Sequence, residues 1–398
     1  MEIPTQTRWG AVSVLILAGV ITALQIGKAA IAVPVLQREL ALTLVTASWV
    51  VGTYGVLGAI GGLPAGILTS LVGARAILIA GLAAAGLGSL AGAFADSGLL
   101  LIATRAIEGC GSLAASLAIP RLIRAITAPK DLDPVLAVWG AHLPIGSVIM
   151  MLGGPSAMTI GWQALWFANG IVALGYAVAV ARVRFDAEPA APHAAGRAVL
   201  PNIRTVLGTS GPPLLALAFG LYTFQYMALS GLLPAMLVDR MGLSIAAAGT
   251  VSAIAVAANA VGNMSAGALL RLGVPTWRII AFAFSFVGLA SLGIFSDAMP
   301  VALVAALAAA SLGITGLVPA SVYAAAPKLA PTSALLAISL GLINQVTNIG
   351  NLAGPAAMAW TVETLGWDGA PALFLGVAIA GVTVALRLRA VMRRAVVP

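Results

Sequence analysis

Long apolar runs, separated by short polar intervals, fill almost the whole chain. Only 8% of its 398 residues are charged and 61% are hydrophobic, whereas a soluble domain carries about 25% charged residues. A soluble chain with so few charges could not cover its own surface, so most of this surface must face lipid. A helix of about 20 apolar residues spans the hydrocarbon of a bilayer. The sequence therefore predicts an all-α, polytopic membrane protein.

Twelve such runs can be counted, and they form two sets of six. The first six lie at about 10–36, 45–68, 76–94, 98–124, 134–157 and 164–183, and the second six at about 212–238, 244–269, 277–295, 299–324, 333–358 and 369–388. The longest polar interval, rich in proline and charge, separates the two sets. We expect a six-helix bundle at 1–183, a cytoplasmic linker at 184–210 and a second six-helix bundle at 211–398.

The basic residues concentrate in every second interval. With the N-terminus in the cytoplasm, all twenty Lys and Arg residues lie in cytoplasmic segments except Lys28, Arg38, Arg105 and Arg240. The positive-inside rule then predicts that both termini lie in the cytoplasm, and we expect a multi-pass protein of a bacterial-type inner membrane. It also accounts for the net charge of +8 without a nucleic-acid partner.

The two halves repeat each other at an offset of about 200 residues. Gly154-Pro155, near the end of the fifth run, corresponds to Gly354-Pro355, near the end of the eleventh. Two six-helix halves in parallel repeat are a transporter architecture, and the solute site of such transporters lies between the halves near the middle of the bilayer.

Several short motifs resemble those of the major facilitator superfamily, over nearly the whole chain. The loop Gly66-Ile-Leu-Thr-Ser-Leu-Val-Gly73-Ala-Arg75 resembles its cytoplasmic loop motif, although Ser70 stands where an acidic residue is expected. Arg105-Ala-Ile-Glu-Gly109 resembles the motif of its fourth span. The resemblance implies twelve transmembrane helices in two pseudo-symmetric bundles that alternate in access.

The fifth run carries a further resemblance. Its Gly153-Gly154-Pro155 is similar to the motif of proton antiporters, and Trp139-Gly140-Ala-His142 to the cyanate and nitroimidazole transporter group of the superfamily. The resemblance gives conformational roles to a set of motif residues: Gly66, Gly73, Arg75, Gly109, Gly154 and Pro155.

Four ionisable side chains fall deep inside the runs. At 1.5 Å per residue, Lys28, Arg105 and Glu108 lie about 12–17 Å below the outer membrane face and His142 about 12 Å above the inner face. A charge at that depth usually faces protein or water. Arg105 and Glu108 can pair as a structural ion pair. Alternatively, Lys28 and Arg105 bind a substrate anion while Glu108 carries a proton. Lys28 could instead snorkel outward, and His142 is either a packed histidine or a proton relay.

The second half offers neutral polar residues in place of these charges. Tyr222, Gln225 and Tyr226 share a face of the seventh run, and Asn344 and Asn348 are one helical turn apart on the eleventh. Their simplest role is hydrogen bonding between helices. Because the charges of the first half have no counterparts here, we favour a role in lining the substrate cavity.

Enzyme motifs and metal-ligand clusters are absent from the sequence, so no cofactor or metal is expected. Without a nucleotide-binding motif, the energy for transport must come from a gradient. The favoured hypothesis is a monomeric secondary transporter that moves a small organic solute, an anion by preference, with protons. One alternative is a proton-antiport efflux pump for drugs or metabolites. An alternative of another class is a non-transporting membrane receptor or enzyme.

Overall fold

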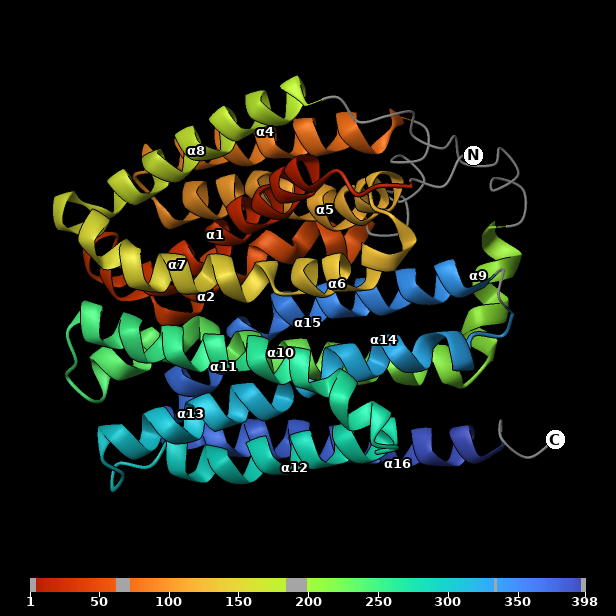
Figure 1. Ribbon diagram of the computed structural model, residues 1–398. Coiled ribbons are helices and arrows are strands. Elements are labelled where there is room, and N and C mark those ends of the chain that lie inside the picture. Colours follow the sequence, from red (N-terminus) through yellow and green to blue (C-terminus); the bar gives the residue numbers. More distant parts are fainter. Residues whose placement is uncertain (1–4, 62–71, 184–198, 333–334, 395–398) are drawn as a thin grey trace.

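The computed structural model describes residues 5–61, 72–183, 199–332 and 335–394, and in these ranges the regular structure is entirely helical (Figure 1). Gly66, one of the expected motif residues, and residues 184–198 of the expected linker lie outside the described ranges.

The first half contains the helices from α1 to α8. They are α1 (Trp9–Glu39), α2 (Leu44–Gly52), the 3-10 turn η1 (Thr53–Gly55), α4 (Ala74–Ala93), α5 (Gly98–Ile126), α6 (Pro129–Gly140), α7 (His142–Ala157), η2 (Met158–Ile160) and α8 (Trp162–Arg182).

The second half begins with a short helix and continues to the C-terminal region. Its elements are α9 (Val199–Gly208), α10 (Gly211–Asp239), α11 (Ile245–Arg271), α12 (Thr276–Ile294), α13 (Val301–Thr315), α14 (Leu317–Leu329), α15 (Leu336–Leu365), η5 (Trp367–Gly369) and α16 (Ala370–Arg394). Helix α9, which the sequence analysis did not predict, lies in the segment expected to be a linker.

The expected spans and the observed helices agree closely. Within the described residues, eleven helical segments are long and apolar enough to cross a membrane. The eleventh expected run, at 333–358, is observed as α15, which is 30 residues long but carries several amides that lower its hydropathy. Length and position identify α15 as a span, and hydropathy alone would miss it.

Besides the second span, which η1 interrupts, two of the described spans are broken near their middle. The fifth is divided into α6 and α7 at Ala141, and the tenth into α13 and α14 at Gly316. In each case a proline follows three residues after the break, Pro144 and Pro319. Proline has no backbone N–H for the carbonyl four residues earlier, so the helix is weakened at that point.

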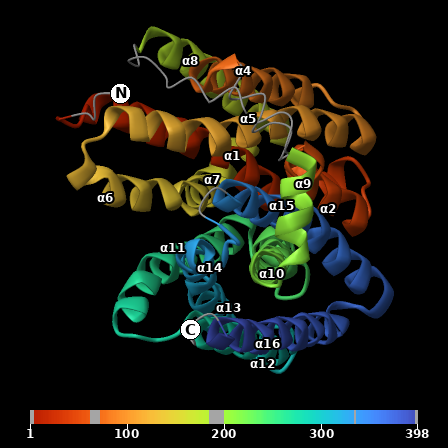
Figure 2. The same cartoon turned by 90° about the vertical axis from the view of Figure 1, so that its right-hand side faces the viewer.

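The helices form two groups, with α1 to α8 in one and α10 to α16 in the other (Figures 1 and 2). We call the end at which α1 begins and α16 ends the basic end, and the other end the opposite end. Several contacts fix the helix termini at the basic end: the N–H of Arg8 donates to the carbonyl of Ile126 at the end of α5, and Arg75 at the start of α4 donates to the carbonyl of Ala181 at the end of α8.

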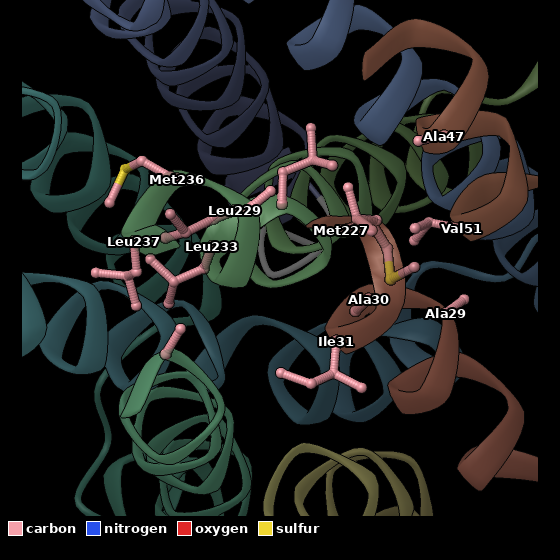
Figure 3. Packing of buried hydrophobic residues seen from close by; sticks show 14 of the residues in the cluster. Ala29, Ala30, Ile31, Ala47, Val51, Met227, Leu229, Leu233, Met236 and Leu237 are labelled. Atoms are coloured by element: carbon pink, nitrogen blue, oxygen red, sulfur yellow. The ribbon is translucent and has the colours of Figure 1, made fainter. Parts of the chain in front are cut away.

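A buried apolar core runs through both groups. It includes Ile31 of α1, Val51 of α2 and Leu233 of α10, which all lie in one cluster (Figure 3). Large apolar side chains such as Leu99 and Ile160 are instead about four-fifths exposed, at 80% and 82%. Apolar residues both inside and outside are what a bilayer-spanning bundle requires.

Glycines bring equivalent helices together in the two halves. Gly154 of α7 faces α1, and a Cβ added to it would lie 3.1 Å from Ile31. Gly354 of α15 packs directly against the backbone carbonyl of Phe224 on α10. The α7–α1 contact and the α15–α10 contact therefore follow the same internal repeat.

Candidate functional site

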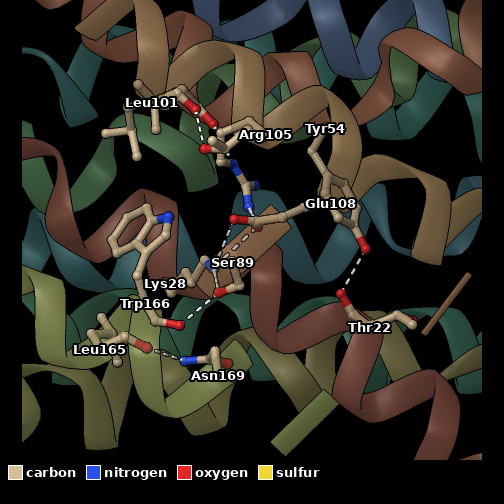
Figure 4. Close-up of polar contacts among 12 residues, drawn as sticks. Thr22, Lys28, Tyr54, Ser89, Leu101, Arg105, Glu108, Leu165, Trp166 and Asn169 are labelled. Carbon is tan, nitrogen blue, oxygen red and sulfur yellow. Dashed lines mark hydrogen bonds and ion pairs between the residues drawn. The ribbon is translucent and has the colours of Figure 1, made fainter. Parts of the chain in front are cut away.

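Three of the four deep ionisable residues meet in one cluster inside the first half (Figure 4). The Glu108 carboxylate lies between two cations: both of its oxygens are 3.1 Å from the Lys28 ammonium, and Arg105 donates to it from one turn earlier on α5. All three side chains are 0% exposed. We call Lys28, Arg105 and Glu108 the charge cluster.

Neighbouring helices supply the remaining partners of the charge cluster. The Lys28 ammonium lies 2.6 Å from the hydroxyl of Ser89 on α4 and 4.7 Å from the ring centre of Trp166 on α8. Ser89 in turn donates to the carbonyl of Trp166, at 2.7 Å. The Arg105 Nε donates to the carbonyl of Val50 on α2, at 2.8 Å. Lys28 thus points into the bundle, and the alternative in which it snorkels outward does not apply.

The charge cluster is not electrically balanced. Two cations share one carboxylate, which leaves a formal charge of +1 in a site with no exposed surface. The Arg105 Nη2 and the indole N–H of Trp166 are buried and have no hydrogen-bond partner. A buried charge without full compensation is costly.

Tyr54 is a site residue that the sequence analysis missed. It lies on the 3-10 turn η1, which interrupts the second span, and its hydroxyl donates to the carbonyl of Thr22 at 2.6 Å. The Arg105 guanidinium carbon is 5.1 Å from its ring centre, in cation–π range. Gly109 makes this close packing possible, since a Cβ there would overlap the carbonyl oxygen of Tyr54. The glycine was visible in the sequence, but its partner was not.

His142 lies apart from the charge cluster. Its Nδ1 is 2.6 Å from the carbonyl oxygen of Trp139, and the two rings stack with centres 3.8 Å apart. This is the packed, hydrogen-bonded arrangement that was one of the two expectations for this residue.

The polar residues of the second half form two separate groups. Tyr222 donates to the side-chain oxygen of Asn259 at 3.1 Å and stacks on Tyr226 with ring centres 5.7 Å apart. On α15, the side-chain amide of Asn348 donates to the carbonyl of Asn344 at 2.9 Å.

Gln225 and Asn348 have distinct environments. Gln225 is only 2% exposed, and neither side-chain amide atom has a partner. Asn348 lies at the contact between the halves, because a Cβ added to Gly55 of η1 would lie 3.3 Å from its carbonyl oxygen. The residues expected to line a cavity are therefore near the centre, but they are not joined to the charge cluster by hydrogen bonds between described residues.

The motif residues occupy structural positions. Gly73 has a φ of +96°, which favours glycine, and precedes α4. Arg75 donates to Ala181 at 2.6 Å, within the first half. Pro155 lies in the last turn of α7, next to Gly154.

Two hydrogen bonds join described residues of the two halves, and both connect α15 to the second span, one at α2 and one in the segment that follows η1. The N–H of Val45 donates to the Glu363 carboxylate at 2.7 Å, near the opposite end. The Gln345 amide donates to the carbonyl of Ala59 at 3.1 Å. Together with the contact of Gly249 on α11 with Met151 on α7, they hold the halves together from the opposite end towards the centre.

Solved structures with the same fold belong to known transporters. Two crystal structures of a bacterial homolog of the human lysosomal transporter Spinster, both inward-facing, one unoccupied and one occupied, match with TM-scores of 0.76 and 0.75. The first match covers 98% of this chain and 97% of that chain, the second 97% of each, and both are 12% identical in sequence. They establish the fold.

Sequence relatives agree with this. The puromycin resistance protein pur8 of Streptomyces alboniger is 28% identical over 175 residues, which is 43% of this chain. The match spans 34%, about a third, of that protein's length. The family model of the Major Facilitator Superfamily matches residues 15–339. The chain therefore belongs to the Major Facilitator Superfamily and is a multi-pass membrane transporter rather than an enzyme.

Proposed function

We propose that this protein is a secondary active transporter that moves a small organic anion together with protons. The observation that carries this proposal is the charge cluster, in which the single carboxylate of Glu108 forms ion pairs with two buried cations, Lys28 and Arg105. In this proposal the two cations bind the anionic group of the substrate, and Glu108 carries the proton.

Charge balance explains how the two events would be linked. With Glu108 ionised, both cations are paired with its carboxylate, and the net formal charge of the cluster is +1. A proton on Glu108 removes its negative charge and releases the cations, and a bound monoanion then returns the total to +1. Proton and monoanion together therefore leave the buried charge unchanged, whereas either one alone changes it in a fully buried site. Glu108 fits this role better than His142, which contacts Trp139 instead.

The same proposal gives the two halves different tasks. Residues 1–183 would form the bundle that holds the charges, and residues 211–398 the bundle that offers hydrogen bonds from Tyr222, Gln225, Tyr226, Asn344 and Asn348. Residues 184–210 would link them on the cytoplasmic side of a bacterial inner membrane, with both termini on that side and the protein a monomer. Rocking of the halves would break the hydrogen bonds of α15 with Val45 and Ala59 and expose the site to the other face.

A second candidate function is proton-driven export of a drug or metabolite. The similarity to a protein named for puromycin resistance favours it. The two candidate functions differ in the direction of transport. Measuring how much solute accumulates in the cell, with and without a proton ionophore, distinguishes them. A proton-coupled importer loses accumulation when the ionophore is added, whereas an exporter then allows more of its solute to accumulate in the cell.

The proposal is tested by transport into vesicles that contain the purified protein. A panel of labelled small carboxylates, with puromycin included for the export alternative, is offered under an imposed proton gradient. We expect Lys28→Met and Arg105→Met to abolish uptake of the anion that the wild type carries, while Glu108→Gln still exchanges that anion but no longer responds to the gradient.

The matched control is Arg38→Met, which removes a cation from the exposed end of α1. It should transport normally. Uptake by Lys28→Met or Arg105→Met at the wild-type rate would exclude these side chains as anion ligands. A response of Glu108→Gln to the gradient equal to that of the wild type would exclude Glu108 as the proton carrier.

A further inference from the structure

We propose that the basic end of α12 and α16 binds the phosphate group of an anionic membrane lipid. The residues that would hold it are Trp277 and Arg278, at the start of α12, and Arg389 and Arg393, near the end of α16. This site lies in the half that lacks the charge cluster, so the inference is independent of the proposed transport mechanism.

Two guanidinium groups meet at one aromatic ring in this site. The Arg389 guanidinium carbon is 4.8 Å from the ring centre of Trp277, and that of Arg278 is 5.4 Å from the same ring. A ring in contact with two cations orients their guanidinium planes without neutralising them. The Arg389 Nε is also buried and has no hydrogen-bond partner. The two cations are therefore held at one ring, and Arg389 keeps a buried N–H without a partner.

No carboxylate among the described residues of the second half can balance these cations. Four acidic residues occur there, and all lie at the opposite end: Asp239, Asp297, Glu363 and Asp368. Each has a partner at that end. Arg240 binds Asp297 and Asp368, the indole N–H of Trp367 donates to Asp239, and Glu363 accepts the N–H of Val45.

The first half also carries an excess of basic residues at its basic end. It carries an acidic residue there, Asp131, which accepts a hydrogen bond from Thr7 at 2.5 Å. Positive charge exceeds negative charge at the basic end of both halves, but general attraction of basic residues to the inner membrane face does not require two guanidinium groups to gather around one tryptophan.

The surroundings suit a lipid phosphate. Leu386, Arg389, Ala390 and Arg393 follow one face of α16 and line a shallow, open depression of about 360 Å³. Leu386 lies farthest from the end of the helix and Arg393 nearest to it, so an acyl chain would contact Leu386, which is 49% exposed, while its phosphate reaches the two arginines. Arginine's planar fork matches phosphate oxygens in pairs, and basic pockets at the ends of spans are sites for anionic headgroups.

The test measures lipid binding to the purified full-length protein in detergent. Phosphatidylglycerol is titrated against the wild type, with phosphatidylcholine as the zwitterionic lipid and glycerol 3-phosphate as the soluble phosphate, and bound lipid is counted by native mass spectrometry. We expect tight binding of phosphatidylglycerol alone, weakened about tenfold by Arg389→Gln, which corresponds to about 1.4 kcal/mol. Because Arg389 also packs on Trp277, the exposed Arg393→Gln serves as a second variant that leaves this packing intact, and it should weaken binding in the same direction.

The matched control is Arg271→Gln, an exposed arginine at the end of α11 on the same side of the same half. It should bind phosphatidylglycerol like the wild type. Equal loss in Arg271→Gln and Arg389→Gln would show a diffuse charge effect and overturn the site, as would equal binding of phosphatidylcholine. Binding of glycerol 3-phosphate that depends on Arg389 and displaces the lipid would overturn the lipid as occupant.

Discussion

The unequal charge of the cluster makes a sharp prediction about stability. Replacing Glu108 with Gln leaves Lys28 and Arg105 buried without a carboxylate, and removal of one partner from a buried ion pair costs about 3–5 kcal/mol. Replacing Lys28 with Met instead leaves Arg105 and Glu108 as a balanced pair. This variant loses the hydrogen bonds of the ammonium to Ser89 and Glu108, so we expect a cost of about 1–2 kcal/mol.

The double variant, Lys28→Met with Glu108→Gln, tests whether the two cations compete for one carboxylate. With Glu108→Gln already present, Lys28→Met removes one of two uncompensated cations, so it should stabilise the protein by about 1 kcal/mol or more instead of destabilising it. Thermal unfolding of the four proteins in one detergent should rank them in stability as wild type, Lys28→Met, the double variant and Glu108→Gln.

The matched control makes the same two changes of charge at the exposed end of α1, with Arg38→Met and Glu39→Gln. Surface charges contribute about 0–1 kcal/mol, so this cycle should be nearly flat. If the costs of Lys28→Met and Glu108→Gln simply add in the double variant, the two cations do not depend on one shared carboxylate for their charge compensation. The reasoning would then be wrong.

Two further predictions concern the opposite end. The hydrogen bond from Arg240 holds the pKa of Asp297 below its usual range, so its contribution to stability is present above the unfolded pKa of about 4 and is lost as pH falls through the folded pKa. Unfolding measured between pH 3 and 6 should show this loss in the wild type and a flatter curve in Asp297→Asn; identical curves would contradict it. Glu363→Gln should weaken the contact of α15 with α2 and make a cysteine placed at buried Val51 more reactive toward a thiol reagent, and unchanged reactivity would show that this carboxylate does not help to close that end.

The spans were predictable because the bilayer imposes their length. The expected run at 98–124 is observed as Gly98–Ile126, and the run at 212–238 as Gly211–Asp239. Where polar residues lie within a span, the length of an apolar run identifies that span less clearly. Helix α15 carries Asn344 and Asn348 at its centre, and these amides reduce the hydropathy that identifies the other spans.

The charge cluster was only partly predictable. Depth along each helix follows from residue number, so Lys28 could be placed at the same level as Arg105 and Glu108. Which way each helix is turned depends on packing between segments far apart in sequence, and so the sequence did not reveal that Glu108 lies between both cations. Tyr54 was hidden for the same reason, since its position depends on the 3-10 turn η1 within the second span.

The internal repeat separates architecture from function in this chain. The close contacts at Gly154 and Gly354 occur at corresponding places in both halves, as expected of features that each bundle needs in order to pack. Lys28, Arg105 and Glu108 have no charged counterparts at the corresponding positions of the second half, where the sequence is apolar. Buried charge is costly and packing does not require it. Because only the first half carries the free-energy cost of buried charge, we infer that the charge serves a function of that half. For these three residues, the proposed binding of anion and proton is such a function.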